Sequence, residues 1–96
     1  MTGMDDPAPL VLVVLPAVLT ALFPCCPREI ELRAATVGEA IAALEARIPG
    51  LGDRICDSTP AIRRHMRVFA GGVRADLATR LAPGTEVLVM TAISGG

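Results

Sequence analysis

Hydrophobic and polar positions along this chain form patterns that predict strands at both ends of the sequence. The run LVLVVL at residues 10–15 is continuously apolar, which is typical of a strand buried on both faces. EVLVM at residues 86–90 predicts a second apolar strand. Residues 28–33 (REIELR) instead alternate, which indicates an edge strand with Ile30 and Leu32 on its buried face.

A helix is predicted directly after this edge strand. Thr36 and Glu39 have the Thr-x-x-Glu spacing of a capping box, in which each residue satisfies a backbone N–H of the first turn. Glu45 falls on another face than the apolar stripe, and Pro49 and Gly50 end the helix. The apolar stripe recurs at helical spacing through Val37, Ile41, Leu44 and Ile48.

The remaining segments are predicted to be shorter elements and connections. Residues 17–23 favour a short helical turn or a loop, and residues 51–64 favour a mixed loop. Residues 66–70 predict a strand that turns at Gly71-Gly72 into a short returning strand at residues 73–75.

The order of these elements predicts one topology. A small sheet has few positions that are buried on both sides, so the two apolar runs should be central and adjacent. The first two strands form a hairpin and the helix crosses over one face, which makes the first and last strands parallel. We therefore predict an α+β protein with the β-grasp fold, a mixed sheet of four to five strands covered by one main helix. Residues 1–9 are predicted to be a flexible N-terminus, residues 10–92 the domain and residues 93–96 an extended tail.

Composition and charge narrow the possible functions. The chain has 96 residues, 52% of them hydrophobic, and a formal net charge of −1. This balance gives no electrostatic attraction to nucleic acid, and Phe23 and Phe69 alone provide no platform for stacking bases. All nine basic residues are arginine, so a phosphate-loop lysine, a Schiff base and a Ser–Lys dyad are excluded. The absence of lysine is explained either by codon bias toward arginine or by a function in which the chain must not be tagged on its own side-chain amines.

The N-terminal region raises the question of a membrane. No charge lies between Asp6 and Arg28, a stretch long enough to span a bilayer. Prolines cut this stretch into short pieces, and Asp5 and Asp6 precede it where a signal peptide would be basic. We therefore predict no membrane segment.

The cysteines predict a reducing compartment and no metal site. Cys25, Cys26 and Cys56 form no C-x-x-C motif, and His65 is the single histidine, so the ligand set of a zinc site is missing. An odd number of cysteines without a secretion signal indicates reduced thiols and a cytoplasmic protein. Cys25 and Cys26 are either small apolar residues of a turn or a reactive pair, and Cys56 and His65 are expected to be structural or surface residues.

The last predicted strand also offers a candidate interaction surface. Val87 and Val89 share the face toward the helix, and Leu88 and Met90 share the other. Leu88 and Met90 either dock a partner or are covered by residues 17–23.

Several blocks of the sequence carry a family resemblance. They are the apolar first strand, ATVGEAIAALEARIPGL at residues 35–51, APGTEV at residues 82–87, and the terminal Gly95-Gly96. Together they resemble the ubiquitin-like sulfur carriers, which include the small subunit of molybdopterin synthase and the thiamine-pathway carrier. The long loop at residues 51–64 is most similar to the longer carriers of cysteine biosynthesis.

This resemblance implies a function for the tail. The carboxylate of Gly96 would be adenylated by a partner adenylyltransferase of the ubiquitin-activating type, which uses ATP. A persulfide or sulfide donor would then convert it to a thiocarboxylate that delivers sulfur to an acceptor biosynthetic enzyme. Ser94 and Gly95 would thread the tail through a narrow channel, where glycine has no Cβ to clash. The chain itself would have no catalytic residues, metal or bound cofactor.

Three alternatives remain from the sequence. The chain could be the small subunit of molybdopterin synthase, with its tail inserted into a larger catalytic subunit. It could be a ubiquitin-like modifier that is conjugated to protein lysines through Gly96. It could also be a β-grasp interaction module whose tail has no role.

Overall fold

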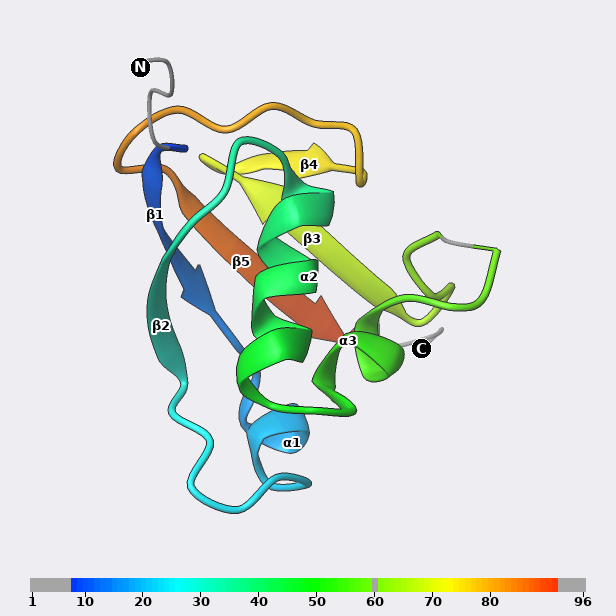
Figure 1. Cartoon of the computed structure of the whole chain (residues 1–96). Coiled ribbons are helices and arrows are strands. Elements are labelled where there is room, and N and C mark those ends of the chain that lie inside the picture. The colour runs from blue at the N-terminus through cyan, green and yellow to red at the C-terminus, as the bar shows by residue number, and fades with distance from the viewer. Residues whose placement is uncertain (1–7, 60, 92–96) are drawn as a thin grey trace.

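A computed structural model describes residues 8–59 and 61–91 of the chain (Figure 1). Within these residues, one sheet contains five strands in the order β2-β1-β5-β3-β4. The strands are β1 (Leu10–Val14), β2 (Glu29–Arg33), β3 (Met66–Ala70), β4 (Val73–Ala75) and β5 (Glu86–Thr91). The helices are α1 (Ala17–Thr20), α2 (Val37–Arg47) and α3 (Leu51–Ile55).

The strand pairing confirms the predicted β-grasp topology. β1 pairs with β2 in an antiparallel hairpin, with Val13 opposite Ile30. β1 and β5 pair in parallel, with Val13 opposite Val87, so the two apolar runs are the central neighbours. β5 continues antiparallel to β3, which forms the predicted hairpin with β4.

Helix α2 begins at the predicted capping box. The Thr36 hydroxyl oxygen accepts a hydrogen bond from the backbone N–H of Glu39 at 3.2 Å, and the Glu39 carboxylate accepts one from the N–H of Ala35 at 2.9 Å. Val37, Ala40, Ile41 and Leu44 are buried against the sheet. This contact forms the core, whose largest fully buried side chains are Leu15, Leu44, Leu51, Ile55, Val11, Val13, Val37, Val68, Val87 and Val89.

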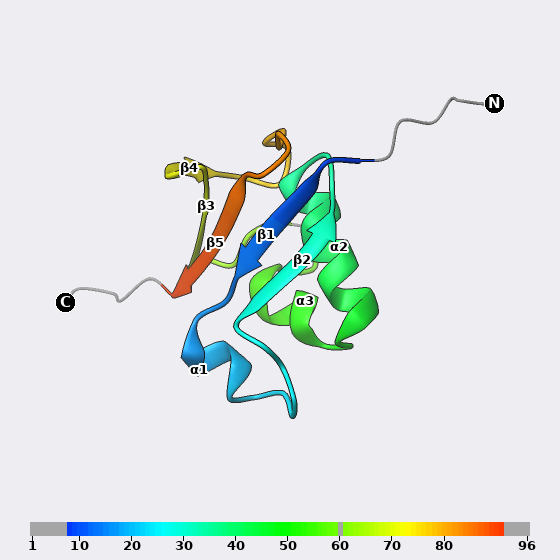
Figure 2. The ribbon, with the colours of Figure 1, turned by 90° about the vertical axis from the view of Figure 1, so that its left-hand side faces the viewer.

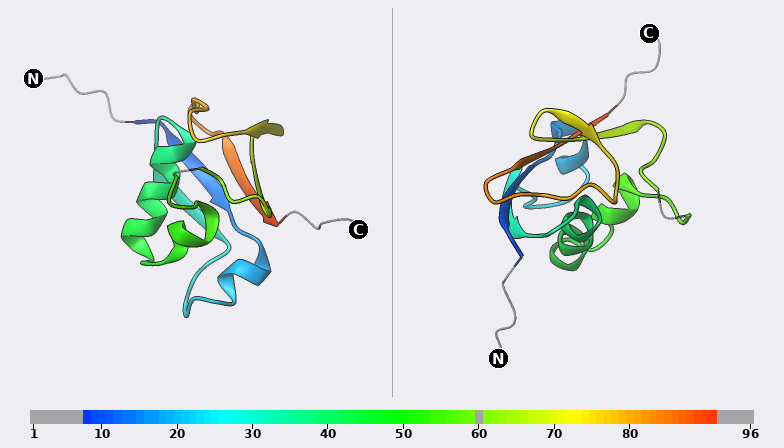
Figure 3. Two further views of the ribbon diagram at one scale, coloured as in Figure 1. Left: turned by 90° about the vertical axis from the view of Figure 1, so that its right-hand side faces the viewer. Right: turned by 90° about the horizontal axis from the view of Figure 1, so that it is seen from above.

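The prediction that the first apolar run is buried on both faces was wrong. Val11 and Val13 are buried, but Leu10 is 41% exposed, and Leu12 and Val14 are only half-buried. The reason is the position of the helices. α2 and α3 lie on one face of the sheet, and α1 lies beyond the carboxyl end of β1 (Figures 1, 2 and 3). The opposite face, which we call the outer face, is therefore left uncovered by these helices.

The segment after α2 also differs from the prediction of a loop. Leu51–Ile55 forms α3, which follows Gly50 in a left-handed conformation with φ 96°. Leu51 and Ile55 are one helical turn apart, and both are fully buried. The predicted short helical turn is confirmed as α1. Residues 1–7 and 92–96, on which most of the predicted N-terminus and tail fall, lie outside the described residues.

Candidate docking face

The outer face of the sheet carries a continuous strip of apolar side chains. The strand register places Val14 of β1 opposite Leu88 of β5, and Leu88 opposite Phe69 of β3. Leu12 and Met90 lie two residues along their strands from Val14 and Leu88, so alternation puts them on the same face. We call Leu12, Val14, Phe69, Leu88 and Met90 the apolar strip.

The apolar strip is open to contact. Met90 is 44% exposed, and the other four residues of the strip are half-buried. Of the two interpretations of Leu88 and Met90, coverage by residues 17–23 is therefore wrong. That segment turns into α1 beyond the end of the sheet, where Val18 is 60% exposed. A contiguous apolar surface of this kind is typical of an interaction site, so docking stays the prediction for both residues.

Charged side chains of opposite sign border the strip. On the β2 side, Glu29 lies opposite Val14 and Glu31 lies opposite Leu12. On the other side, Arg74 of β4 lies opposite Phe69, and Arg67 of β3 lies opposite Met90. Beside the strip, carboxylates therefore lie on the β2 side and guanidinium groups on the β3–β4 side, while Glu86 of β5 lies opposite Leu12 and Arg33 of β2 lies opposite Leu10. Such an arrangement orients a partner of complementary charge and disfavours the reversed orientation.

Sequence reasoning missed these bordering charges, although each lies on a correctly predicted strand. Glu29 and Arg74 are far apart in the sequence, and strand register alone places them at opposite ends of one row. The alternation of each strand indicates which of its charged residues share a face. Only the pairing of the strands shows that these residues border one surface.

A small hollow adjoins the strip where β5 ends. Its volume is about 260 Å³, and it is lined by residues that include Leu15, Arg28, Met90 and Thr91. Arg28 donates a hydrogen bond from Nε to the carbonyl of Leu15 at 3.2 Å. The hollow thus lies beside Thr91, the last residue of β5.

The predicted tail residues cannot be placed on this surface. Ser94, Gly95 and Gly96 lie outside the described residues, so their roles stay predictions.

Neither Cys26 nor Cys56 is an activated thiol, because the pKa of each is raised. Burial raises the pKa of the Cys26 thiol. Burial also raises the pKa of Cys56, and the neighbouring Asp57 charge adds to this effect while Arg63 opposes it. Cys25 is exposed, has φ 62° and is free, as are the other two cysteines. Cys26 packs partly against the core, as expected for a small apolar residue, and it is not joined to Cys25.

The described part of the chain offers neither a cluster of metal ligands nor a membrane-spanning helix. No three His, Cys, Asp or Glu side chains among residues 8–59 and 61–91 gather in a group that could hold a metal ion. Within the same ranges, every helix is too short or too polar to cross a bilayer.

Comparison with known proteins gives matches in structure only. No protein-family model matches the sequence, and no curated protein matches it. The crystal structure of SAMP1 from Haloferax volcanii is 28% identical to this chain, with a TM-score of 0.76, and the match covers 91% of this chain and 99% of SAMP1.

Two structures that contain CysO also match. The Amycolatopsis orientalis BexX/CysO complex contains a chain with 23% identity and a TM-score of 0.79, which covers 90% of this chain and 99% of its own. Mycobacterium tuberculosis CysO is 24% identical with a TM-score of 0.77, and covers 86% of this chain and 99% of CysO. At these identities the CysO structures show the fold alone.

These neighbours confirm the resemblance that the sequence indicated. The chain has the ubiquitin-like β-grasp fold. It is similar over nearly its whole length to SAMP1, and it shares the fold of CysO.

Proposed function

We propose that this chain, which has the fold of the ubiquitin-like sulfur carriers, carries sulfur as a thiocarboxylate on Gly96. The observation that supports this proposal most directly is the similarity to SAMP1 and to CysO over nine-tenths of the chain. The sequence adds Gly95-Gly96 after β5, the central strand that is parallel to β1.

The chemistry follows from the electrophile that the tail would provide. The Gly96 carboxylate attacks the α-phosphate of ATP, pyrophosphate leaves, and an acyl adenylate forms. A sulfide nucleophile then adds to the acyl carbon and AMP leaves, which gives the thiocarboxylate. A persulfide donor would form an acyl disulfide, which a second thiol reduces to the same product. Both steps need a site that excludes water and holds the tail in line, which we assign to the activating enzyme.

The role of this chain in that reaction is to be recognised. We assign recognition to the apolar strip, in which Met90 has the most exposed side chain and Leu88 lies at the centre. The acidic edge at Glu29 and the basic edge at Arg74 would fix how the partner sits, so that the tail enters its active site. The CysO chain of Amycolatopsis orientalis was crystallised with BexX, which supports the expectation of a protein partner.

The experiment is intact-mass spectrometry of the purified protein with its activating enzyme, ATP and a sulfur donor. The mass of the untreated protein first establishes that Gly96 is its last residue. We then expect a gain of about 16 mass units, from exchange of one oxygen for sulfur, that requires ATP. The variant Gly96→Ala should not gain this mass. An unchanged mass for the parent protein under conditions in which the enzyme is active on another carrier contradicts the proposal.

The docking role is tested in the same assay with Leu88→Asp. Leu88 lies between Val14 and Phe69, so a carboxylate at this position is left without a partner in an apolar contact, and we expect at least about a hundredfold loss in the rate of adenylation. Val73→Asp is the matched control, because Val73 is 69% exposed and lies outside the strip. Equal rates for both variants and the parent would refute docking through the strip.

A second function is favoured by the SAMP1 match. SAMP1 of Haloferax volcanii is a small archaeal modifier protein, and a second crystal structure of it is 25% identical to this chain. If this chain is also a modifier, Gly96 would form isopeptide bonds with lysines of other proteins. Because the chain has no lysine, none of these bonds can lie within a chain of its own copies. Digestion of tagged conjugates should then show Gly96-derived remnants on other proteins. The molybdopterin synthase subunit and the cytoplasmic location stay predictions.

A further inference from the structure

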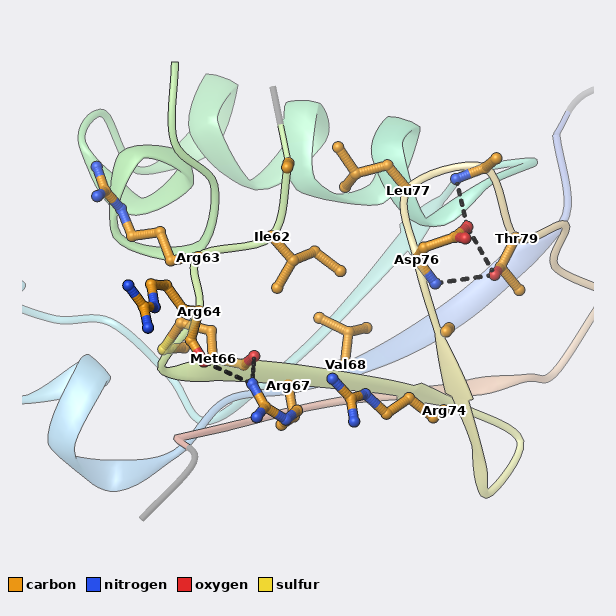
Figure 4. Close-up of a pocket in the computed structure, with 13 residues that line it drawn as sticks. Ile62, Arg63, Arg64, Met66, Arg67, Val68, Arg74, Asp76, Leu77 and Thr79 are labelled. Atoms are coloured by element: carbon orange, nitrogen blue, oxygen red, sulfur yellow. Dashed lines mark hydrogen bonds between the residues drawn. The ribbon is translucent and has the colours of Figure 1, made fainter. Parts of the chain in front are cut away.

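A groove with a volume of about 650 Å³ lies on the side of the molecule that carries β3 and β4 (Figure 4). Segment 61–64 forms one wall and segment 75–79 forms another, while β3 forms the floor. The side chains of Ile62, Val68 and Leu77 point into it. Val68 is buried, and Ile62 and Leu77 are half-buried. The interior of the groove is therefore apolar.

The rim of the groove is strongly basic. Four arginines line it, at positions 63, 64, 67 and 74, and Arg64 and Arg74 are exposed. One carboxylate also lines it, that of Asp76. This carboxylate accepts hydrogen bonds from the backbone N–H of Ala78 at 2.9 Å and from the Thr79 hydroxyl at 3.2 Å. Asp76 thus stabilises the turn to which it belongs, and the arginines dominate the charge of the rim.

Two of the arginines are held in place by the backbone. Arg63 donates from Nε to the carbonyl of Asp53 at 2.6 Å. Arg67 donates from one terminal nitrogen to the carbonyls of Arg64 at 2.6 Å and Met66 at 2.8 Å. A hydrogen bond to a neutral carbonyl leaves the positive charge uncompensated. A guanidinium has five N–H donors, so others remain for an anionic ligand.

The strand edge beside the groove determines how a ligand could be held. β4 pairs with β3 only from Val68 to Ala70, so among the described residues Met66 and Arg67 have no strand beside them on that edge. Met66 and Arg67 line the groove. Both backbone groups of Met66 are already bonded, because its N–H donates to the carbonyl of Arg63 at 2.9 Å and its carbonyl accepts from the Arg67 guanidinium at 2.8 Å. A segment in the groove would therefore be held through its side chains and not by strand pairing.

We propose that this groove binds an acidic segment of a partner protein, with carboxylates on the arginine rim and an apolar side chain over Ile62, Val68 and Leu77. Nucleic acid fits less well, because neither phenylalanine of the chain lines the groove and no base could stack there. The apolar interior also gives a phosphate chain nothing to contact. The groove shares Arg67 and Arg74 with the basic edge of the apolar strip, but the inference goes beyond the proposed function, since it requires neither the tail nor ATP.

The test is fluorescence anisotropy of the full chain with a short labelled peptide of aspartates and glutamates around a central leucine. We expect saturable binding that weakens as salt rises. Two analogues probe the two parts of the groove. One has asparagine and glutamine in place of the acids, and the other has serine in place of leucine. Each should bind at least about tenfold more weakly, since tenfold corresponds to about 1.4 kcal/mol.

Two double variants locate the site. Arg64→Glu with Arg74→Glu reverses two exposed charges on the rim, and we expect at least about a tenfold loss of affinity for the acidic peptide. Arg33→Glu with Arg47→Glu makes the same change in net charge on β2 and α2, and should retain binding within about twofold. Circular dichroism of each variant establishes that it is folded.

Three outcomes would overturn the proposal. The first is equal affinity for the acidic peptide and its amide analogue. The second is an equal loss in both double variants, which would indicate attraction by net charge alone. The third is displacement of the peptide by a single-stranded oligonucleotide at lower concentration than by unlabelled peptide, which would identify a nucleic-acid site. None of these outcomes bears on thiocarboxylate formation, which mass spectrometry measures separately.

Discussion

The side chain of Glu45 joins α2 to α3, and its removal gives the sharpest test of how this fold is held together. One carboxylate oxygen, Oε2, accepts a hydrogen bond from the backbone N–H of Gly50 at 2.9 Å. The other, Oε1, accepts one from the N–H of Gly52 at 2.8 Å. These N–H groups belong to the first turn of α3 and to the residue before it, which have no partner within the helix. Glu45 therefore takes the place of a side-chain N-cap.

The size of the effect follows from these two bonds. A hydrogen bond to a charged group contributes about 1.5–3 kcal/mol when buried. Glu45 is half-buried, so we take the lower part of this range for each bond. Glu45→Ala should lower the free energy of unfolding by about 2–3 kcal/mol. For a domain of this size, that corresponds to a fall in Tm of about 10–20 °C. Glu45→Gln keeps one acceptor oxygen and should lose about half as much.

Urea denaturation followed by circular dichroism measures these differences. Glu29→Ala is the matched control, because Glu29 is exposed on β2, and it should change stability by less than about 0.5 kcal/mol. If Glu45→Ala is no less stable than Glu29→Ala, the two bonds do not stabilise the fold and the reasoning is refuted. Because α3 also positions Arg63 through the carbonyl of Asp53, Glu45→Ala should in addition weaken the acidic-peptide groove.

Two further predictions concern the same side of the molecule. Gly52→Ala would place a Cβ 2.9 Å from Oε1 of Glu45, so we expect a loss of about 1–2 kcal/mol in urea denaturation, and a smaller loss in the Glu45→Ala background; simple additivity of the two changes would contradict this. The Thr59 hydroxyl donates to Asp57 and, with backbone N–H groups, lowers the pKa of that carboxyl, so Thr59→Ala should raise the Asp57 pKa in an NMR titration. Because the pKa of Asp57 is depressed in the folded state, this carboxyl contributes to stability above about pH 4, and the contribution is lost as pH falls through the folded pKa. An unchanged Asp57 pKa in Thr59→Ala would contradict the assignment.

The strand order could be predicted from the sequence because two apolar runs compete for the few interior positions of a small sheet. That competition alone predicts β1 beside β5, and the strand register confirms it. The capping box at Thr36 and Glu39 is equally local, since both hydrogen bonds lie within one turn. The pairing of the central strands and the local helix cap are therefore accessible from one sequence.

The helix α3 was missed because its start has no Ser, Thr, Asp or Asn at the N-cap. Gly50 occupies that position in a left-handed conformation, and the acceptors come from Glu45, five residues earlier. Sequence patterns predict a cap when the capping residue directly precedes the helix. When the capping side chain comes from the preceding helix, the cap depends on how the two helices pack and is not predicted by the pattern.

The error about burial has a more general cause. A continuous apolar run indicates that both faces of a strand avoid water, but it does not say what covers them. In this chain Val11, Val13, Val87 and Val89 are buried on the face that carries α2 and α3, while Leu12, Val14, Leu88 and Met90 lie on the open outer face. Apolar side chains retained on an uncovered face are most simply explained by a surface that another protein covers. The error thus marks the candidate docking site.

The arginines show why net charge is a poor guide to this surface. The formal net charge is −1, yet glutamates border one edge of the strip and arginines the other. Several arginines also act as structural donors: the side chains at positions 28, 33, 47, 63 and 67 each bond a backbone carbonyl. A guanidinium has the additional N–H groups to do this while it still presents charge to a ligand, whereas a lysine amine has three donors on one atom. Arg67 at the basic edge and Arg63 beside the groove both use this property.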